Sequence, residues 1–182
     1  MNISIDAIKT LREKTGAPLG NIRAALEEAK GDEQRATQIL QRKGFESARK
    51  RQDRATAAGR IEAYAHHDGR LAVLVEINCE TDFVARTPEF QQFCRDVAMQ
   101  VASQNPSVIT KEQLSAKQLN EAKAEDKPAD QLAKDTTLLE QPFIKDQGQT
   151  IGQYLTGMIA KTGENIVITR FTRFALGETR AA

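Results

Sequence analysis

Tryptophan is absent from this chain of 182 residues, and cysteine is rare, with only Cys79 and Cys94. Their spacing matches no metal site, so we expect free thiols and no disulfide, as in a cytoplasmic protein. Long apolar runs are absent as well, since the longest, residues 71–75, has the length of a strand rather than of a membrane-spanning helix. The N-terminus has no basic segment followed by an apolar one, which predicts no secretory signal. We therefore expect no association with a membrane.

An excess of charge of either sign is also missing. The 26 basic residues balance the 25 acidic ones to a net charge of +1, which predicts no general attraction to nucleic acid. One local basic cluster comprises Arg49, Lys50, Arg51 and Arg54. Because Glu46 and Asp53 lie within it and no aromatic residue does, we favour a solvated linker over a nucleic-acid patch. No direct contact with nucleic acid is expected.

Motifs that bind nucleotide phosphates or metals are absent too. The chain has neither a Gly-x-x-x-x-Gly-Lys-Ser/Thr loop nor a Gly-x-Gly-x-x-Gly turn after a strand. The adjacent histidines His66 and His67 are expected on a strand, where neighbouring side chains point to opposite faces. Two such histidines could not ligate one metal ion together. We therefore expect no cofactor and no metal.

The sequence around Cys79 does not favour a cysteine nucleophile. Glu80 and Asp82 flank Cys79 and would raise its thiol pKa, which favours a buried structural cysteine over a reactive thiolate. A thiol enzyme using Cys79 is thus a third class of function, and rapid alkylation at neutral pH would reveal it. We expect no catalytic residue and conclude that the chain is not an enzyme.

Apolar residues at helical spacing predict three short helices between residue 4 and about residue 43. Thr15-Gly16 ends the first, and Pro18 suits the first position of the second. Gly31 is the expected left-handed cap of the second helix, and Asp32 can cap the third. Gly44 is expected to end the third helix. So small a bundle has few large side chains and would be marginally stable alone.

From Gly59 onward the apolar period changes to two, which predicts strands. We expect strands over residues 59–66 and 70–78, joined by a hairpin turn at Asp68-Gly69. A third strand is expected over residues 165–176. Regular alternation would give it one face with Val167, Thr169, Phe171 and Arg173, and another with Ile166, Ile168 and Phe174.

Helices are expected between the second and third strands. Thr87-Pro88 predicts the start of one helix, and Asn105-Pro106 predicts its end. The capping-box pattern of residues 110–113 predicts another helix start. Residues 115–136 are polar helix or linker, and a last helix is expected to stop at Thr162-Gly163.

These patterns predict an α+β fold, in which a three-helix bundle precedes a small antiparallel three-stranded sheet packed with helices. We divide the chain into a bundle, a basic linker, a core and a disordered tail, at residues 1–45, 46–58, 59–177 and 178–182.

The most informative stretch is residues 78–90, which joins the second strand to the next helix. It places the carboxylate of Asp82 beside the large aromatic side chain of Phe83. Connections normally run over the surface, whereas burial of a Phe is worth about 1.5–3 kcal/mol. Phe83 therefore either packs into its own core or is carried outward to enter a partner.

Two segments together resemble translation elongation factor Ts, the guanine-nucleotide exchange factor of elongation factor Tu. The first is LREKTGA at residues 11–17, continued by ALEEAKGD at residues 25–32 and RKG at residues 42–44, and the second is EINCETDFVAR at residues 76–86. Residues 141–146 and 163–171 also resemble family segments, so that the resemblance covers nearly the whole chain. It implies an N-terminal bundle like a ubiquitin-associated domain, followed by an α+β core.

The resemblance also implies a partner and two contact surfaces. The partner is elongation factor Tu, in its GDP-bound and nucleotide-free forms. The bundle would contact the nucleotide-binding domain of that partner through the matching positions Lys9, Arg12, Leu19 and Gly20. The segment that disturbs the magnesium site matches Thr81, Asp82, Phe83 and Val84, with Phe83 as a wedge between helices of the partner. No covalent bond is made or broken in such an exchange.

Two departures from the family pattern bear on these expectations. The family often has methionines after Thr-Gly-Ala, whereas this chain has Pro18-Leu19-Gly20, so a methionine-like contact at position 20 is lost. Long members carry two core halves and this chain carries one. A lone three-stranded sheet leaves an apolar face and open edges, so we expect a homodimer.

The alternative function is a non-enzymatic peptide- or protein-binding adaptor. Its bundle would bind a peptide and its core would only dimerise. Asp82 and Phe83 discriminate between the two functions, because an adaptor needs no wedge.

Overall fold

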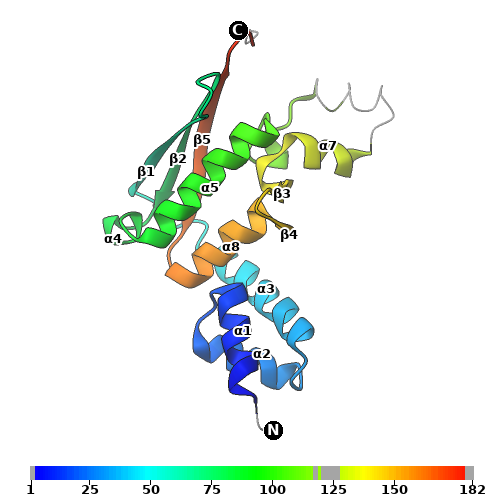
Figure 1. Ribbon diagram of the computed structural model, residues 1–182. Coiled ribbons are helices and arrows are strands. Elements are labelled where there is room, and N and C mark those ends of the chain that lie inside the picture. The colour runs from blue at the N-terminus through cyan, green and yellow to red at the C-terminus, as the bar shows by residue number, and fades with distance from the viewer. Residues whose placement is uncertain (1–2, 117–118, 120–127, 179–182) are drawn as a thin grey trace.

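The computed structural model describes residues 3–116, 119 and 128–178. Three helices, α1 (Ile5–Thr15), α2 (Leu19–Glu28) and α3 (Glu33–Arg49), form a bundle at one end of the molecule, and a sheet stands at the other (Figure 1). The fold is α+β, as the sequence predicted. The expected tail lies mostly outside the described residues, which end at Glu178.

Local capping signals fix the helices of the bundle. Asp32 accepts a hydrogen bond from the backbone N–H of Arg35 at 3.0 Å and caps α3 as expected. Gly31 adopts the predicted left-handed conformation, with φ 90°. The bundle encloses a small apolar core of its own, whose largest members are Leu11, Ile22, Leu26, Ile39 and Leu40.

Helix α3 is longer than predicted. We expected Gly44 to end it, but the helix continues to Arg49, and the boundary that we drew at residue 45 falls inside it. A Cβ added at Gly44 would lie 3.3 Å from Cγ2 of Thr156, on helix α8 (Ile151–Thr162). Gly44 thus allows α3 and α8 to approach each other closely, and it does not end α3.

The sheet has the strand order β1-β2-β5, with β1 (Ala58–Ala65), β2 (Leu71–Cys79) and β5 (Ile166–Ala175) all antiparallel. Helix α5 (Pro88–Gln104) begins at the predicted Thr87 cap and covers one face of the sheet (Figure 1). The core of the protein lies between them. Its buried side chains include Val73, Val75, Ile77, Phe90, Phe93 and Val97.

Strand β5 departs from the regular alternation that we predicted. Ile77 pairs with Ile168 whereas the preceding Glu76 pairs with Arg170, so Thr169 is an extra residue in a bulge. The bulge reverses the facing of every residue that follows it. Phe171 therefore lies opposite Val75 and packs against the core, and the prediction that it shares a face with Val167 was wrong.

The segment between α5 and β5 is less regular than expected. The capping box at Thr110 is present, but the described residues that follow it directly form a 3-10 turn, η1 (Lys111–Gln113), rather than the first turn of an α-helix. Helix α7 (Ala129–Thr136), the turn η2 (Leu138–Glu140) and a small unpredicted sheet of β3 (Pro142–Phe143) and β4 (Asp146–Thr150) follow. Part of the predicted polar helix or linker over residues 115–136 lies outside the described residues. Helix α8 ends at the expected Gly163, which has φ 75°.

Within the parts of the chain that the structure describes, every helix is too short or too polar to span a bilayer.

Candidate functional site

The stretch after β2 forms a short helix that the sequence analysis missed. This helix, α4 (Asp82–Ala85), has only 4 residues and lies at the end of the sheet that is nearer the bundle (Figure 1). Thr81 is its N-cap, with an extended backbone and a side chain that accepts a hydrogen bond from the N–H of Val84 at 3.4 Å. The segment is therefore an ordered projection rather than an irregular loop.

Phe83 points away from its own core. It is 81% exposed, although a buried Phe would be worth about 1.5–3 kcal/mol. Of the two alternatives that the sequence left open, the structure thus shows Phe83 carried outward and not packed into its own core. An aromatic ring held in water on an ordered helix is a surface suited to a partner.

The other residues of the predicted segment divide into two groups. Asp82 is exposed and forms an ion pair with Arg86 at 3.0 Å, and such an exposed pair is worth little and leaves the carboxylate accessible. Val84 is partly buried and packs against the core, and Thr81 is the cap. The segment therefore presents Asp82 and Phe83 outward while Thr81 and Val84 anchor it.

Cys79 belongs to this anchor. Burial is the main cause that raises the pKa of its thiol to about 11, with the nearby carboxylates of Glu164 and Asp82 as lesser ones. The flanking acids that we expected to raise this pKa are therefore not its main cause. At neutral pH the side chain is a thiol, which donates a hydrogen bond to the carbonyl oxygen of Thr81 at 3.2 Å. This environment does not support a thiolate nucleophile.

The histidine pair is arranged differently from our expectation. Strand β1 ends at Ala65, so His66 and His67 lie in the hairpin turn, and their ring centroids are 4.3 Å apart instead of on opposite faces. Across the residues that the structure describes, no group of three or more His, Cys, Asp or Glu side chains could hold a metal ion.

The second predicted surface lies on the bundle. Lys9 and Arg12 are exposed on α1, three positions apart and hence on neighbouring parts of one helix face. Leu19 and Gly20 are exposed at the start of α2, and a Cβ added at Gly20 would meet nothing within 4 Å. Arg12 and Leu19 flank the connection between the two helices. We call these four residues the bundle patch.

A third surface is the face of the sheet that α5 leaves uncovered. Large apolar side chains stand on it in the open, notably Phe174, which is 64% exposed. The others are Ile61 on β1, Leu74 on β2 and Val167 on β5. We call these four residues the open sheet face.

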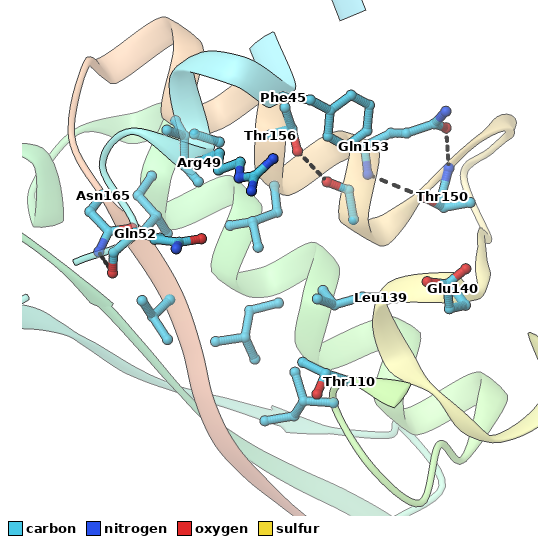
Figure 2. A pocket seen from close by; sticks show the side chains of 18 residues that line it. Phe45, Arg49, Gln52, Thr110, Leu139, Glu140, Thr150, Gln153, Thr156 and Asn165 are labelled. Carbon is cyan, nitrogen blue, oxygen red and sulfur yellow. Dashed lines mark hydrogen bonds between the residues drawn. The ribbon is translucent and has the colours of Figure 1, made fainter. Parts of the chain in front are cut away.

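A hollow lies between α3, α8 and β5 (Figure 2). It is an open groove of about 770 Å³, with Phe45 at one end and Thr110 at the other, and Val167 of the open sheet face is among the residues that line it. No residue of α4 or of the bundle patch lines it. The groove is therefore separate from both predicted contact surfaces, α4 and the bundle patch.

Comparison with known proteins finds similarity along nearly the whole chain. A family model described as Elongation factor TS matches residues 21–178, a range that includes α4 and the whole sheet. The chain is 43% identical over 195 residues to Elongation factor Ts of Rubrobacter xylanophilus, with 97% of this chain and 100% of the relative covered.

Two further relatives agree with this match. Elongation factor Ts of Carboxydothermus hydrogenoformans is 45% identical over 199 residues, which cover 97% of this chain and 90% of the relative. Elongation factor Ts of Caldanaerobacter subterraneus is 44% identical over 195 residues, with 97% and 98% covered. The similarity thus extends over nearly the full length of both partners in each comparison.

Proposed function

Because the chain belongs to the elongation factor Ts family and is thereby a nucleotide exchange factor for elongation factor Tu, we propose that α4 carries out the exchange step. The observation that carries this proposal is the 81% exposure of Phe83 on an ordered helix. Phe83 enters between helices of the nucleotide-binding domain of elongation factor Tu, with Asp82 beside it. The magnesium and phosphate site of the partner is disturbed as a result, and GDP leaves.

Such an exchange is differential binding and not covalent chemistry. Contacts of Phe83 and Asp82 that strengthen as magnesium and GDP loosen lower the barrier to release. The factor binds both the GDP-bound and the nucleotide-free partner, and it shifts the partner toward the open state because it binds that state better. Burial of the Phe83 ring in the partner would contribute about 1.5–3 kcal/mol to binding, which the exposed ring does not gain in the free protein.

The bundle patch supplies a second contact on the same partner, through Lys9, Arg12, Leu19 and Gly20. The exposure of all four residues supports this assignment. The division into bundle, linker and core is a proposal that truncation can test, with the first boundary at the end of α3, Arg49, rather than at residue 45. We assign the activity to the cytoplasm, with no part for nucleic acid or membrane.

The direct test is release of labelled GDP from elongation factor Tu with and without this protein. We expect substoichiometric amounts of the protein to accelerate release, because each molecule dissociates and acts again. Tight binding without any acceleration would instead favour the adaptor function. No binding at all would contradict both.

We further propose that the protein is a homodimer joined through the open sheet face. The exposed Phe174, Ile61 and Leu74 support this, since so large an apolar face is costly in water. An isologous interface about a two-fold axis would cover it with its own copy. A stable pair of this kind buries more than about 1,000 Å² in total.

Phe174→Asp is expected to convert the dimer into monomers, because a carboxylate would then be desolvated in the interface. Light scattering at micromolar concentration measures the mass. Phe45→Asp is the matched control, since Phe45 is also a partly exposed aromatic, at 47%, but lies in the groove of Figure 2. A parent protein with the mass of one chain at every concentration would rule the dimer out. GDP release by the separated monomers shows whether exchange needs the dimer.

A further inference from the structure

Helix α4 is too short to hold itself together. One isolated helical turn is unfavourable in water, because several residues are fixed for a single hydrogen bond. Yet α4 is ordered with an exposed Phe83, so contacts from other elements must maintain it.

Glu164 makes the most direct of these contacts. Its Oε2 accepts a hydrogen bond from the backbone N–H of Thr81 at 3.1 Å, and its Oε1 accepts one from Oγ1 of Thr81 at 2.6 Å. Hydrogen bonds to a carboxylate are stronger than neutral ones. The N-cap of α4 is thus held at both of its donors by one side chain from the turn between α8 and β5.

A second carboxylate makes the reciprocal contact. Oε1 of Glu80, at the end of β2, accepts a hydrogen bond from the backbone N–H of Asn165 at 2.6 Å. Each of the two chain segments therefore contributes one carboxylate that accepts hydrogen bonds from the other. Glu80 binds the turn between α8 and β5, and Glu164 binds the segment that follows β2. We call Glu80, Thr81, Glu164 and Asn165 the carboxylate clasp.

The linker that follows the bundle holds the clasp in place. Nε of Arg51 donates a hydrogen bond to the carbonyl oxygen of Gly163 at 2.9 Å. Asn165, only 3% exposed, donates from Nδ2 to the carbonyl oxygens of Gln52 at 3.2 Å and Arg54 at 2.9 Å. Figure 2 shows Asn165 and Gln52 side by side. The basic linker is thus attached to the turn that carries Glu164, and not merely solvated as we expected.

We propose that Glu164 is a positioning residue for nucleotide exchange, and that the carboxylate clasp presents Phe83 in its binding orientation before the partner arrives. The inference rests on the proposed function of Phe83. Its physical basis is preorganisation, because a helix that is already ordered loses less conformational freedom on binding. Glu164 itself need not touch elongation factor Tu.

The first test needs no partner. Glu164→Ala removes both acceptors, and hydrogen–deuterium exchange of the amides of Thr81, Val84, Ala85 and Arg86 should accelerate by at least about tenfold. Glu164→Gln should restore protection, since its amide oxygen can accept from the N–H of Thr81 while its nitrogen donates to Oγ1. Should Glu164→Ala fail to fold, Glu164→Asp, whose shorter side chain cannot span both donors, replaces it.

The second test measures GDP release from elongation factor Tu at increasing concentrations of the full-length variants. Glu164→Ala should lower the saturating rate at least about fivefold and change the half-saturating concentration less than about twofold, because the bundle patch still binds. Added to Phe83→Ala, it should cost less than about a further twofold, since both changes act through the same helix. Glu178→Ala is the control, a carboxylate bound twice by Arg173, and should change neither quantity.

The outcomes separate the inference from the function on which it rests. Unchanged amide exchange in Glu164→Ala overturns the inference, whatever the rates of GDP release. Losses that multiply in the double variant overturn it as well, because Glu164 would then act apart from Phe83. If amide exchange accelerates in Glu164→Ala but Phe83→Ala stimulates GDP release at the parent rate, the proposed role of Phe83 as a wedge is wrong. The conclusion that Glu164 keeps α4 ordered is then still supported.

Discussion

Phe83→Ala is expected to lower stimulated GDP release by at least about tenfold, which corresponds to about 1.4 kcal/mol of lost transition-state stabilisation. The ring is 81% exposed, so its removal creates no cavity and should leave the stability of the fold nearly unchanged. The loss should therefore appear in the exchange rate and not in the melting temperature. Stopped-flow release of a fluorescent GDP analogue from elongation factor Tu measures it.

Two further variants sharpen this experiment. Phe83→Leu keeps an apolar side chain on α4 and should give an intermediate rate, since part of the buried area is retained. Phe45→Ala removes another exposed aromatic that is far from α4 in the sequence and should leave the rate unchanged. A Phe83→Ala protein that exchanges nucleotide as fast as the parent would contradict the wedge.

Removal of the bundle is expected to weaken binding to elongation factor Tu by at least about tenfold, or about 1.4 kcal/mol. A chain that begins at residue 55 should still fold, because all the buried side chains of the core cluster lie within residues 73–168, although Ala48 of α3 packs against them. The loss reflects the missing contacts of the bundle patch. Calorimetric titration measures the affinity, and an unchanged value would show that the bundle has another role.

A second truncation separates two effects that the first one combines. A chain that begins at residue 45 also lacks the bundle patch but keeps Arg51 and Gln52, which hold the turn at Gly163 and Asn165. Both truncated chains should bind weakly. At saturation, only the chain that begins at residue 55 should release GDP more slowly than the parent, because α4 is then less firmly held.

Signals that act within a few residues allowed much of this fold to be predicted from the sequence. The turn at Asp68-Gly69 fixed the register of β1 and β2, and the Thr87 cap fixed the start of α5. Asp32 likewise marked the start of α3. In each case one residue and its immediate neighbours decide the conformation, so no knowledge of the tertiary structure was needed.

The features that were missed depend on residues far apart in the chain. Helix α4 has only 4 residues, about one helical turn, so the hydrophobic pattern cannot repeat within it and does not predict it. The role of Gly44 is set by Thr156, and the bulge at Thr169 is set by pairing with β2. Glu164 lies 83 residues from Thr81, and nothing near it in the sequence marks it as part of the site.

The surface of the candidate site was predicted better than its support. The sequence placed a carboxylate, Asp82, beside a large aromatic, Phe83, where a strand ends, and the family resemblance assigned both to partner contact; both are exposed. Thr81 and Val84 were grouped with them, although the structure uses these two as anchors. Residues that bind a partner can stand out in a sequence, whereas residues that orient them have no signature of their own.

The continuity of α3 past Gly44 has a consequence for the distance between the bundle patch and Phe83. Because one unbroken helix leads out of the bundle and rests on α8, we expect the separation between the bundle patch and Phe83 to be a fixed span rather than a distribution of lengths. When a flexible tether joins two binding surfaces, the second surface can reach binding places at many distances from the first. When the connection is rigid, both surfaces bind at once only if their separation equals the distance between the two binding places on the partner. If both surfaces bind elongation factor Tu as proposed, the fit of the two contacts depends on the distance between their binding places on that partner, and a nucleotide domain that changes shape alters this fit.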